Sequence, residues 1–255
     1  MPEIGRGAAP SITPGHAYVG TSGWAYATWK PTFYPAEIKS KDFLRYYATR
    51  FSTLEVNYTF NHLPTEKNIA TWKDATPPDF LFALKASQQI THVRQLRDPA
   101  ETVPLFFERA APLGERFGPV LFQTPPWLKR DDDRLAGFLA SLPRDIRCAL
   151  EVRDPSWYVE EVYELLRTAG VALVHAEGER APSPVETLGI TAPFAYTRLR
   201  AREGYDEAAV GRWAARLREL VASGKDVYAY FRHDDTGANA LSAERLRDEL
   251  AVRSE

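Results

Sequence analysis

The segment ALEVRDPSWY, residues 149–158, places an acid and a base at the end of an apolar run. Side chains alternate along an extended strand, so Glu151 and Arg153 would share one face. Leu150 and Val152 would then face the opposite side. A strand has this pattern when it starts in a packed interior and ends at an opening that holds water. There Glu151 could transfer protons and Arg153 could grip an anion through two hydrogen bonds.

Other apolar runs end in polar side chains in the same way. In each run we take the polar residues that share a face with the preceding inward positions, as Glu151 and Arg153 do. They are Glu55 and Asn57 in 51–58, Lys85 in 79–87, Gln123 in 118–125, His175 in 170–177, Arg198 and Arg200 in 193–200, and either Arg232 or His233 in 226–234. The candidate catalytic acid–base groups are Glu55, Glu151 and His175. The candidate cations for a phosphate or carboxylate are Lys85, Arg153, Arg198 and Arg200. Periodicity does not choose between Arg232 and His233.

Aromatic and further polar side chains follow several of these runs. Trp24, Trp127 and Trp157 lie within a few residues of a run's end and could stack on a base or sugar ring. They could equally pack loops over the core. Asp234 could face the cavity or begin the last helix, and Asn239 follows it closely.

Each polar candidate also has a purely structural interpretation. Glu151 and Arg153 could form an ion pair that sets local register. Lys85 could extend to solvent, Gln123 could cap backbone groups, and His175 could be a half-buried core residue. Taken together these interpretations are weaker, because gathering several charges in one cavity costs desolvation without structural gain.

The elements that would position these groups alternate between strand and helix. Eight apolar runs occur at 17–24, 51–58, 79–87, 118–125, 147–155, 170–177, 193–200 and 226–234. Helical patterns follow most of them, at 41–51, 65–75, 103–117, 131–142, 156–170, 206–224 and 238–253. This predicts a TIM-like (β/α)8 barrel in one domain, residues 17–255, after a flexible tail, residues 1–16. The stretch 178–192 lacks helical periodicity, so the sixth connection is expected to be irregular.

A doubly wound open sheet is the alternative fold. It would have fewer strands and usually a glycine-rich phosphate loop after the first strand. The first run ends in TSGW, which is not GxGxxG, and GxxxxGK[ST] is absent.

Composition narrows the class of protein. The 255 residues have a formal net charge of −2, so no basic excess indicates nucleic acid. The single cysteine, Cys148, lies in an apolar run and suits a small core residue. We find no signal-peptide pattern and no apolar stretch of membrane-spanning length, so we expect a cytoplasmic protein without membrane contact.

Several segments resemble the YecE-like family, also described as domain of unknown function 72. They are VGTSGWAY, STLEVNYTFNHLP, FALKASQQITH, LFQTPPW, LEVRDPSW, YTRLR and YFRHDDTGANAL, and the resemblance covers roughly residues 17 to 250. It implies a TIM barrel with a mouth lined by these motifs, and it implies no activity. In the family the last strand usually ends in two asparagines, where this chain has Arg232 and His233. Asn239 corresponds to the family's later asparagine.

The residues favour a small anionic ligand, phosphorylated or nucleotide-like. Whether the protein is an enzyme stays open; as one, it would suit a hydrolase or lyase acting on a phosphate-containing substrate. The alternatives are a metal-dependent phosphodiesterase resembling endonuclease IV, a glycoside hydrolase using Glu55 and Glu151, and a non-catalytic ligand-binding or regulatory barrel. A nuclease-like site would draw on Glu55, Glu151, His175 and Asp234, but no HxH or HExxH occurs, so we assign no metal ligand. No cofactor is identified, and a nucleic acid remains an allowed partner.

Overall fold

Eight parallel strands close a barrel in the computed structural model, which describes residues 13–177, 190–201 and 204–251. The strands are β1 Ala17–Thr21, β2 Thr53–Val56, β3 Leu81–Lys85, β4 Phe117–Gln123, β5 Cys148–Glu151, β6 Ala172–Glu177, β7 Phe194–Leu199 and β8 Asp226–Phe231. Their order in the sheet is β1-β8-β7-β6-β5-β4-β3-β2. A parallel bridge between Ser22 and Glu55 joins β1 to β2. The predicted TIM-like barrel is therefore confirmed.

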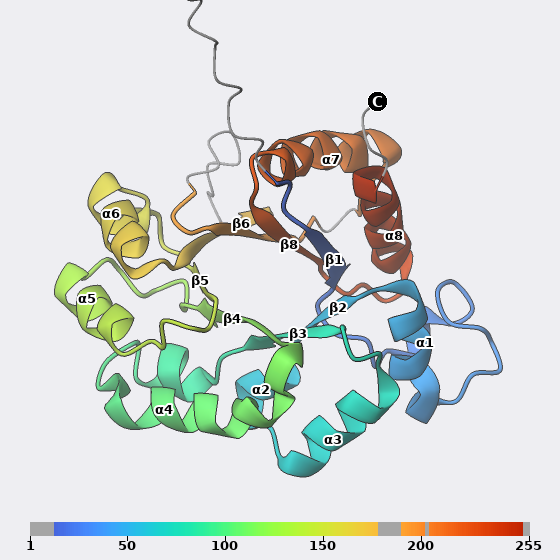
Figure 1. Ribbon diagram of the computed structural model, residues 1–255, viewed down its shortest axis with the longest axis horizontal. Helices are drawn as coiled ribbons and strands as arrows, with labels where there is room; N and C mark the ends of the chain where they lie inside the picture. The colour runs from blue at the N-terminus through green and yellow to red at the C-terminus, as the bar shows by residue number, and fades with distance from the viewer. Residues whose placement is uncertain (1–12, 178–189, 202–203, 252–255) are drawn as a thin grey trace, which may run out of the picture.

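Helices surround the strands on the outside (Figure 1). They are α1 Phe43–Arg50, α2 Tyr58–Asn61, α3 Glu66–Ala75, α4 Pro99–Ala110, α5 Asp132–Ala140, α6 Glu160–Ala169, α7 Glu207–Ala222 and α8 Ala238–Ala251. Shorter helical turns lie at Ala27–Trp29, Ser40–Asp42, Gln89–Val93, Ala111–Arg116 and Pro155–Trp157. The short α2 was not expected, and α4 begins earlier than predicted. Most of the sixth connection and of the tail lies outside the described residues.

Local sequence explains where several helices begin and end. The Asp131 carboxylate accepts the backbone N–H of Arg134 and so caps α5. Asp206 caps α7 in the same way by accepting the N–H of Ala209. Gly170 ends α6 with φ 68°, a left-handed conformation that glycine adopts without strain.

Alternation along the strands separates an inner core from an outer one. The inner core consists of small and aromatic side chains, among them Ala83, Leu121, Ala149, Val174, Tyr196, Tyr228 and Tyr230. The outer core, between strands and helices, includes Leu54, Phe82, Phe122, Leu150, Leu173 and Phe231. Toward the carboxyl ends the inner row turns polar, with Glu55 in β2, Glu151 in β5 and Arg198 in β7. The barrel interior is therefore filled by apolar side chains nearer the amino ends of the strands and by polar side chains nearer their carboxyl ends.

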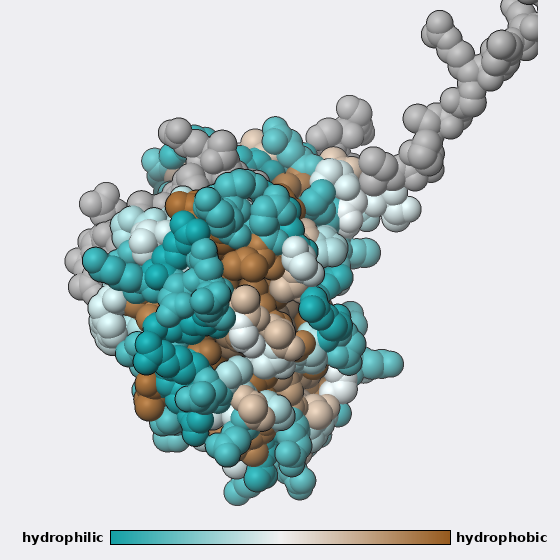
Figure 2. Space-filling view, turned by 90° about the vertical axis from the view of Figure 1, so that its left-hand side faces the viewer, coloured by the Kyte–Doolittle hydropathy of each residue, from teal (hydrophilic) through white to brown (hydrophobic). Residues whose placement is uncertain are grey.

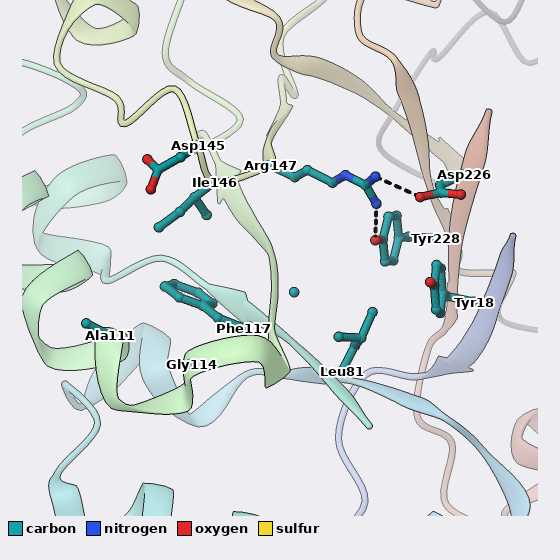
Figure 3. A pocket seen from close by; sticks show the side chains of 11 residues that line it. Tyr18, Leu81, Ala111, Gly114, Phe117, Asp145, Ile146, Arg147, Asp226 and Tyr228 are labelled. Carbon is teal, nitrogen blue, oxygen red and sulfur yellow. Dashed lines mark hydrogen bonds and ion pairs between the residues drawn. The ribbon is translucent and has the colours of Figure 1, made fainter. Parts of the chain in front are cut away.

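The amino ends of the strands surround a hollow of about 520 Å³ (Figure 3). Arg147 extends across it to form an ion pair with Asp226 at 2.7 Å and a hydrogen bond with the hydroxyl of Tyr228. The ring of Tyr18 stacks on that of Tyr228, with centroids 4.8 Å apart. The Arg147 charge at this end is thus neutralised within the protein, which fits a role in stability.

The outer surface is mostly polar on the side of α5 and α6. Figure 2 shows hydrophilic side chains over most of this face, with smaller hydrophobic areas between them. None of the helices within the described ranges is long and apolar enough to cross a bilayer.

Leu150→Ala tests the outer core. The Leu150 side chain is fully buried between β5 and the helices, so its loss should lower the free energy of unfolding by about 2–5 kcal/mol. Urea denaturation would measure this. The control is Leu105→Ala on α4, where Leu105 is 40% exposed and the loss should stay below about 1 kcal/mol. Equal losses in the two variants would contradict the assigned packing.

Candidate functional site

A buried ion-pair bridge forms the centre of the barrel mouth. Arg198 of β7 donates to Glu55 Oε1 of β2 at 2.7 Å and to Glu151 Oε2 of β5 at 2.6 Å. The three residues are at most 3% exposed. The remaining carboxylate oxygens are also bonded: Tyr196 donates its hydroxyl to Glu55 at 2.8 Å, and Gln123 donates to Glu151 at 2.8 Å. Every carboxylate oxygen of the bridge therefore has a partner.

The bridge is held in its charged form. Burial by itself would raise the pKa of Glu55 and of Glu151, but the Arg198 charge and the hydrogen bonds outweigh it and lower both pKa values. Burial would lower the pKa of Arg198, yet the two carboxylates raise it above its usual range. At neutral pH both glutamates are ionised, so each could accept a proton but neither holds one to donate.

Lys85 extends the network from the end of β3. Its Nζ donates to Gln123 Oε1 at 2.9 Å and lies 4.0 Å from the centroid of the Phe60 ring. Burial and repulsion by Arg198 lower the pKa of Lys85 to about 8, although Glu55 and Glu151 act in the opposite direction.

Three further arginines lie around the bridge. Arg153 and Arg200 follow β5 and β7 on the inner face, and Arg232 continues the inward row of Tyr228 and Tyr230. Burial and the neighbouring Arg198 lower the pKa of Arg200 to about 10. Within the described ranges none of the three arginines has a carboxylate at ion-pair distance. The ring of His233 instead stacks on Tyr26, at 4.7 Å.

The predicted inward placement of His175 is wrong. Val174 and Ala176 belong to the inner core, so His175 lies on the outer face of β6 with Leu173. It is 2% exposed, and neither ring nitrogen has a hydrogen-bond partner in the part of the chain that the structure describes. Alternation separates the two faces of a strand but does not say which of them points inward. Because both faces of β6 are largely apolar, the inner face could not be recognised from the sequence. Glu177 also points outward, to the indole N–H of Trp213.

Two of the tryptophans that were candidates for stacking on a ligand pack against the protein itself. Trp157 is fully buried in the outer core, and its indole N–H donates to the Leu128 carbonyl at 2.7 Å. It cannot stack on a ligand, so that prediction is wrong. Trp24 is half-buried and packs edge-on against Trp72 of α3, with centroids 6.4 Å apart.

Asp234 orders the start of α8. Its carboxylate accepts backbone N–H groups of Thr236, Gly237 and Asn239, and so acts as the structural alternative anticipated. The buried Asn239 donates its amide to the Arg232 carbonyl at 3.0 Å, while Asn239 Oδ1 has no partner among the residues described.

A hollow of about 550 Å³ lies between the loops that follow β7 and β8. Its lining includes Gly204, Arg232, His233, Asp235 and Asn239. Loops at this point of a TIM barrel often hold a phosphate group. Asn57, at the end of β2, is half-buried and its side chain makes no cap to α2.

An aromatic rim beside Lys85 was only partly anticipated. Trp127 is 65% exposed and meets the His92 ring edge-on at 6.4 Å. His92 in turn meets Phe60 at 4.9 Å. Phe60 and His92 follow strands in the motifs NYTFNH and SQQITH, but loop residues have no periodicity that would indicate their direction. Tyr196 was also missed, because an inward tyrosine resembles any other core residue.

No metal site is assembled by the described side chains. No group of three His, Cys, Asp or Glu residues in these ranges is arranged to hold a metal ion. Of the set weighed from sequence, His175 faces outward and Asp234 caps a helix, so the metal-dependent alternative has no geometric support here.

The fold and mouth define a TIM-like α/β barrel with a charged opening at the carboxyl ends of its strands. The chain belongs to the family described as Protein of unknown function DUF72, whose model matches residues 18–255. UPF0759 protein YunF of Bacillus subtilis is 25% identical over 270 residues, covering 92% of this chain and 95% of that protein. UPF0759 protein YecE of Escherichia coli is 30% identical over 144 residues, which are 56% of this chain and 50% of that protein.

Solved structures agree with this assignment. A DUF72 family protein from Thermotoga maritima superposes with a TM-score of 0.81 at 28% identity, over 92% of this chain and 99% of that one. Another, from Enterococcus faecalis, has a TM-score of 0.75 at 17% identity, over 94% and 97% of the two chains, and shows the fold alone. The resemblance found in the sequence motifs is thereby confirmed.

His175→Leu should remove one source of acid sensitivity. Burial lowers the pKa of His175 from 6.5 to about 4, so below pH 6.5 the unfolded chain binds a proton that the folded protein does not. This destabilises the wild type by about 2 kcal/mol between pH 7 and pH 5. Urea denaturation at both pH values should show a smaller loss in the variant. An exposed control, His62→Leu, should retain the full loss, and equal losses in all three proteins would contradict the placement.

Arg198→Met should leave two buried carboxylates without their cation. We expect a loss of about 3–5 kcal/mol in the free energy of unfolding at pH 7. Unpaired and buried, the carboxylates acquire raised pKa values, and the stability from such groups is present at low pH and lost as pH rises. The deficit relative to wild type should therefore shrink at pH 5. In the control Arg167→Met, loss of the exposed Arg167–Glu160 pair should change the free energy of unfolding only slightly at either pH. A deficit that grows at pH 5 would argue against the bridge.

Proposed function

We propose that the barrel mouth binds a small anionic ligand through a phosphate or carboxylate group. The observation that carries this is an excess of cations. Glu55 and Glu151 carry two negative charges and Arg198 carries one positive charge. Lys85, Arg153 and Arg200 add three further cations, and none of these three has a carboxylate at ion-pair distance among residues 13–177, 190–201 and 204–251. A charge without a partner in a half-buried position costs desolvation free energy that a bound anion would offset.

The pKa values support the same conclusion. Those of Lys85 and Arg200 are lowered, chiefly by burial and next by the Arg198 charge, so the protein disfavours their charged forms. An anion placed between them would favour those forms and bind more tightly as a result. Arginine also presents N–H groups in a planar fork that fits phosphate and carboxylate oxygens.

The position in the barrel fits this role. The cations follow β3, β5 and β7 at the carboxyl ends, where TIM barrels hold their ligands. The hollow of about 550 Å³ lined by Arg232 offers space on the side of β7 and β8. The exposed Trp127 and the neighbouring His92 could stack on a planar ring, which suits a nucleotide-like ligand.

A proton transfer at this mouth could use the glutamates as bases. Glu55 and Glu151 are ionised and face the same cation, so they could accept a proton from a substrate bound above them. A hydrolase or lyase acting on a phosphate-containing substrate remains the reaction class we propose. A nuclease-like metal centre is not favoured, because His175 faces outward and the Asp234 carboxylate caps α8.

Arg153→Gln and Arg200→Gln test the binding site. A thermal-shift screen with inorganic phosphate, sugar phosphates and nucleotides would find a ligand, and calorimetry would give its affinity. A charge-assisted hydrogen bond contributes about 1.5–3 kcal/mol, so each variant should bind roughly 10- to 100-fold more weakly.

Arg109→Gln is the matched control, because Arg109 is exposed on α4 away from the mouth. It should bind as the wild type does. Affinity unchanged in both mouth variants, or lost equally in the control, would overturn the proposal.

A further inference from the structure

Lys85 has an environment unlike that of a surface lysine. It is the last residue of β3 and half-buried, and its Nζ contacts the Gln123 amide oxygen and the face of the Phe60 ring. No described carboxylate lies at ion-pair distance from this nitrogen. The amine is therefore oriented by neutral groups.

The orientation of Gln123 is determined by the ion-pair bridge. Its amide nitrogen donates to Glu151 at 2.8 Å, which leaves only the amide oxygen to face Lys85. The amide oxygen accepts a hydrogen bond from the amine and so orients it. If the Gln123 amide were flipped, its NH2 group would face the amine of Lys85, and two donors would meet. The bridge therefore determines the orientation of Gln123, and through it the position of Lys85 Nζ.

Charged groups surround Lys85 on several sides. Those that influence it are Arg198, Glu55, Glu151, Arg200 and His92. With burial as the largest cause, the pKa of Lys85 is lowered to about 8. At pH 7 roughly one tenth of Lys85 is then the free amine, against roughly one part in several thousand for an ordinary lysine.

We propose that Lys85 is a nucleophile that forms an imine with the carbonyl group of an anionic aldehyde or ketone. This rests on the proposed function, because Arg153 and Arg200 would hold the anionic group. A half-buried amine directed by Gln123 and partly free of its proton is suited to attack a carbonyl carbon. Anion binding alone would not require the amine to be buried against a ring and an amide.

The step balances without an added oxidant or reductant. The nitrogen lone pair of Lys85 forms a bond to the carbonyl carbon, and the carbonyl oxygen becomes a hydroxyl. That hydroxyl leaves as water when the carbon–nitrogen double bond forms. Both protons of the free amine end on the departing water.

Reductive trapping tests this inference on the intact protein. Wild type would be incubated with succinic semialdehyde or with butanal, which have the same number of carbons but differ in charge, and then treated with sodium borohydride. Peptide mass mapping would locate the alkylated amines, including the other lysines and the chain's α-amino group. At pH 7 we expect Lys85 to be modified at least tenfold faster than the exposed Lys67, with succinic semialdehyde faster than butanal.

The pH profile and two variants complete the test. Modification of Lys85 should level off above pH 8, whereas that of an ordinary lysine rises toward pH 10. Lys85→Arg keeps the charge but should lose the fast modification, while Lys67→Arg should retain it. The peptide map of wild type stands by itself if Lys85→Arg fails to fold.

The outcomes separate this inference from the proposed function. If Lys85 is modified no faster than Lys67 by either aldehyde, the inference is overturned while anion binding by thermal shift is unaffected. If both aldehydes modify Lys85 equally fast, its nucleophilic role is supported but the anionic substrate is rejected, and the proposed function loses support with it.

Discussion

Arg198 holds two glutamates from distant strands, and the arrangement of the mouth depends on that contact. Glu55 reaches it from β2 and Glu151 from β5, so one guanidinium connects three parts of the barrel wall. Separated from their partner, buried charges would be strongly unfavourable, and each therefore restricts where the others can lie. Gln123 takes its orientation from Glu151, and Lys85 takes its position from Gln123. The position of Lys85 thus depends on contacts that begin at the buried ion-pair bridge.

The contrast between the two ends of the barrel follows from how charge is neutralised. At the amino ends Arg147 forms an ion pair with Asp226. At the carboxyl ends Arg198 pairs with two glutamates, while Lys85, Arg153 and Arg200 have no carboxylate at ion-pair distance within the described ranges. A protein gains no stability from such an excess. Its presence at one end is therefore the main support for the ligand that we propose there.

The sequence was sufficient for the fold and for much of the mouth. Each of the eight apolar runs contains a strand, and alternation set Glu55, Glu151 and Arg198 on the inner face where the structure has them. It failed at His175, because both faces of β6 are apolar and neither is marked as the interior. The burial of Trp157 and the direction of Phe60 and His92 could not be predicted for another reason. Their contacts depend on the path of loops, which alternation does not describe.

The pairing of β1 with β8 has a consequence for how the chain matures during synthesis. Ala17–Thr21 pairs in register with Val227–Phe231, so the backbone hydrogen bonds between β1 and β8 cannot form until the last strand has been synthesised. Glu55 and Glu151 likewise leave the ribosome before Arg198. Until β7 emerges, neither carboxylate has the Arg198 partner that it has in the folded barrel. Barrel closure and formation of the ion-pair bridge therefore both need the last part of the chain, and a nascent chain that stops before β7 has neither.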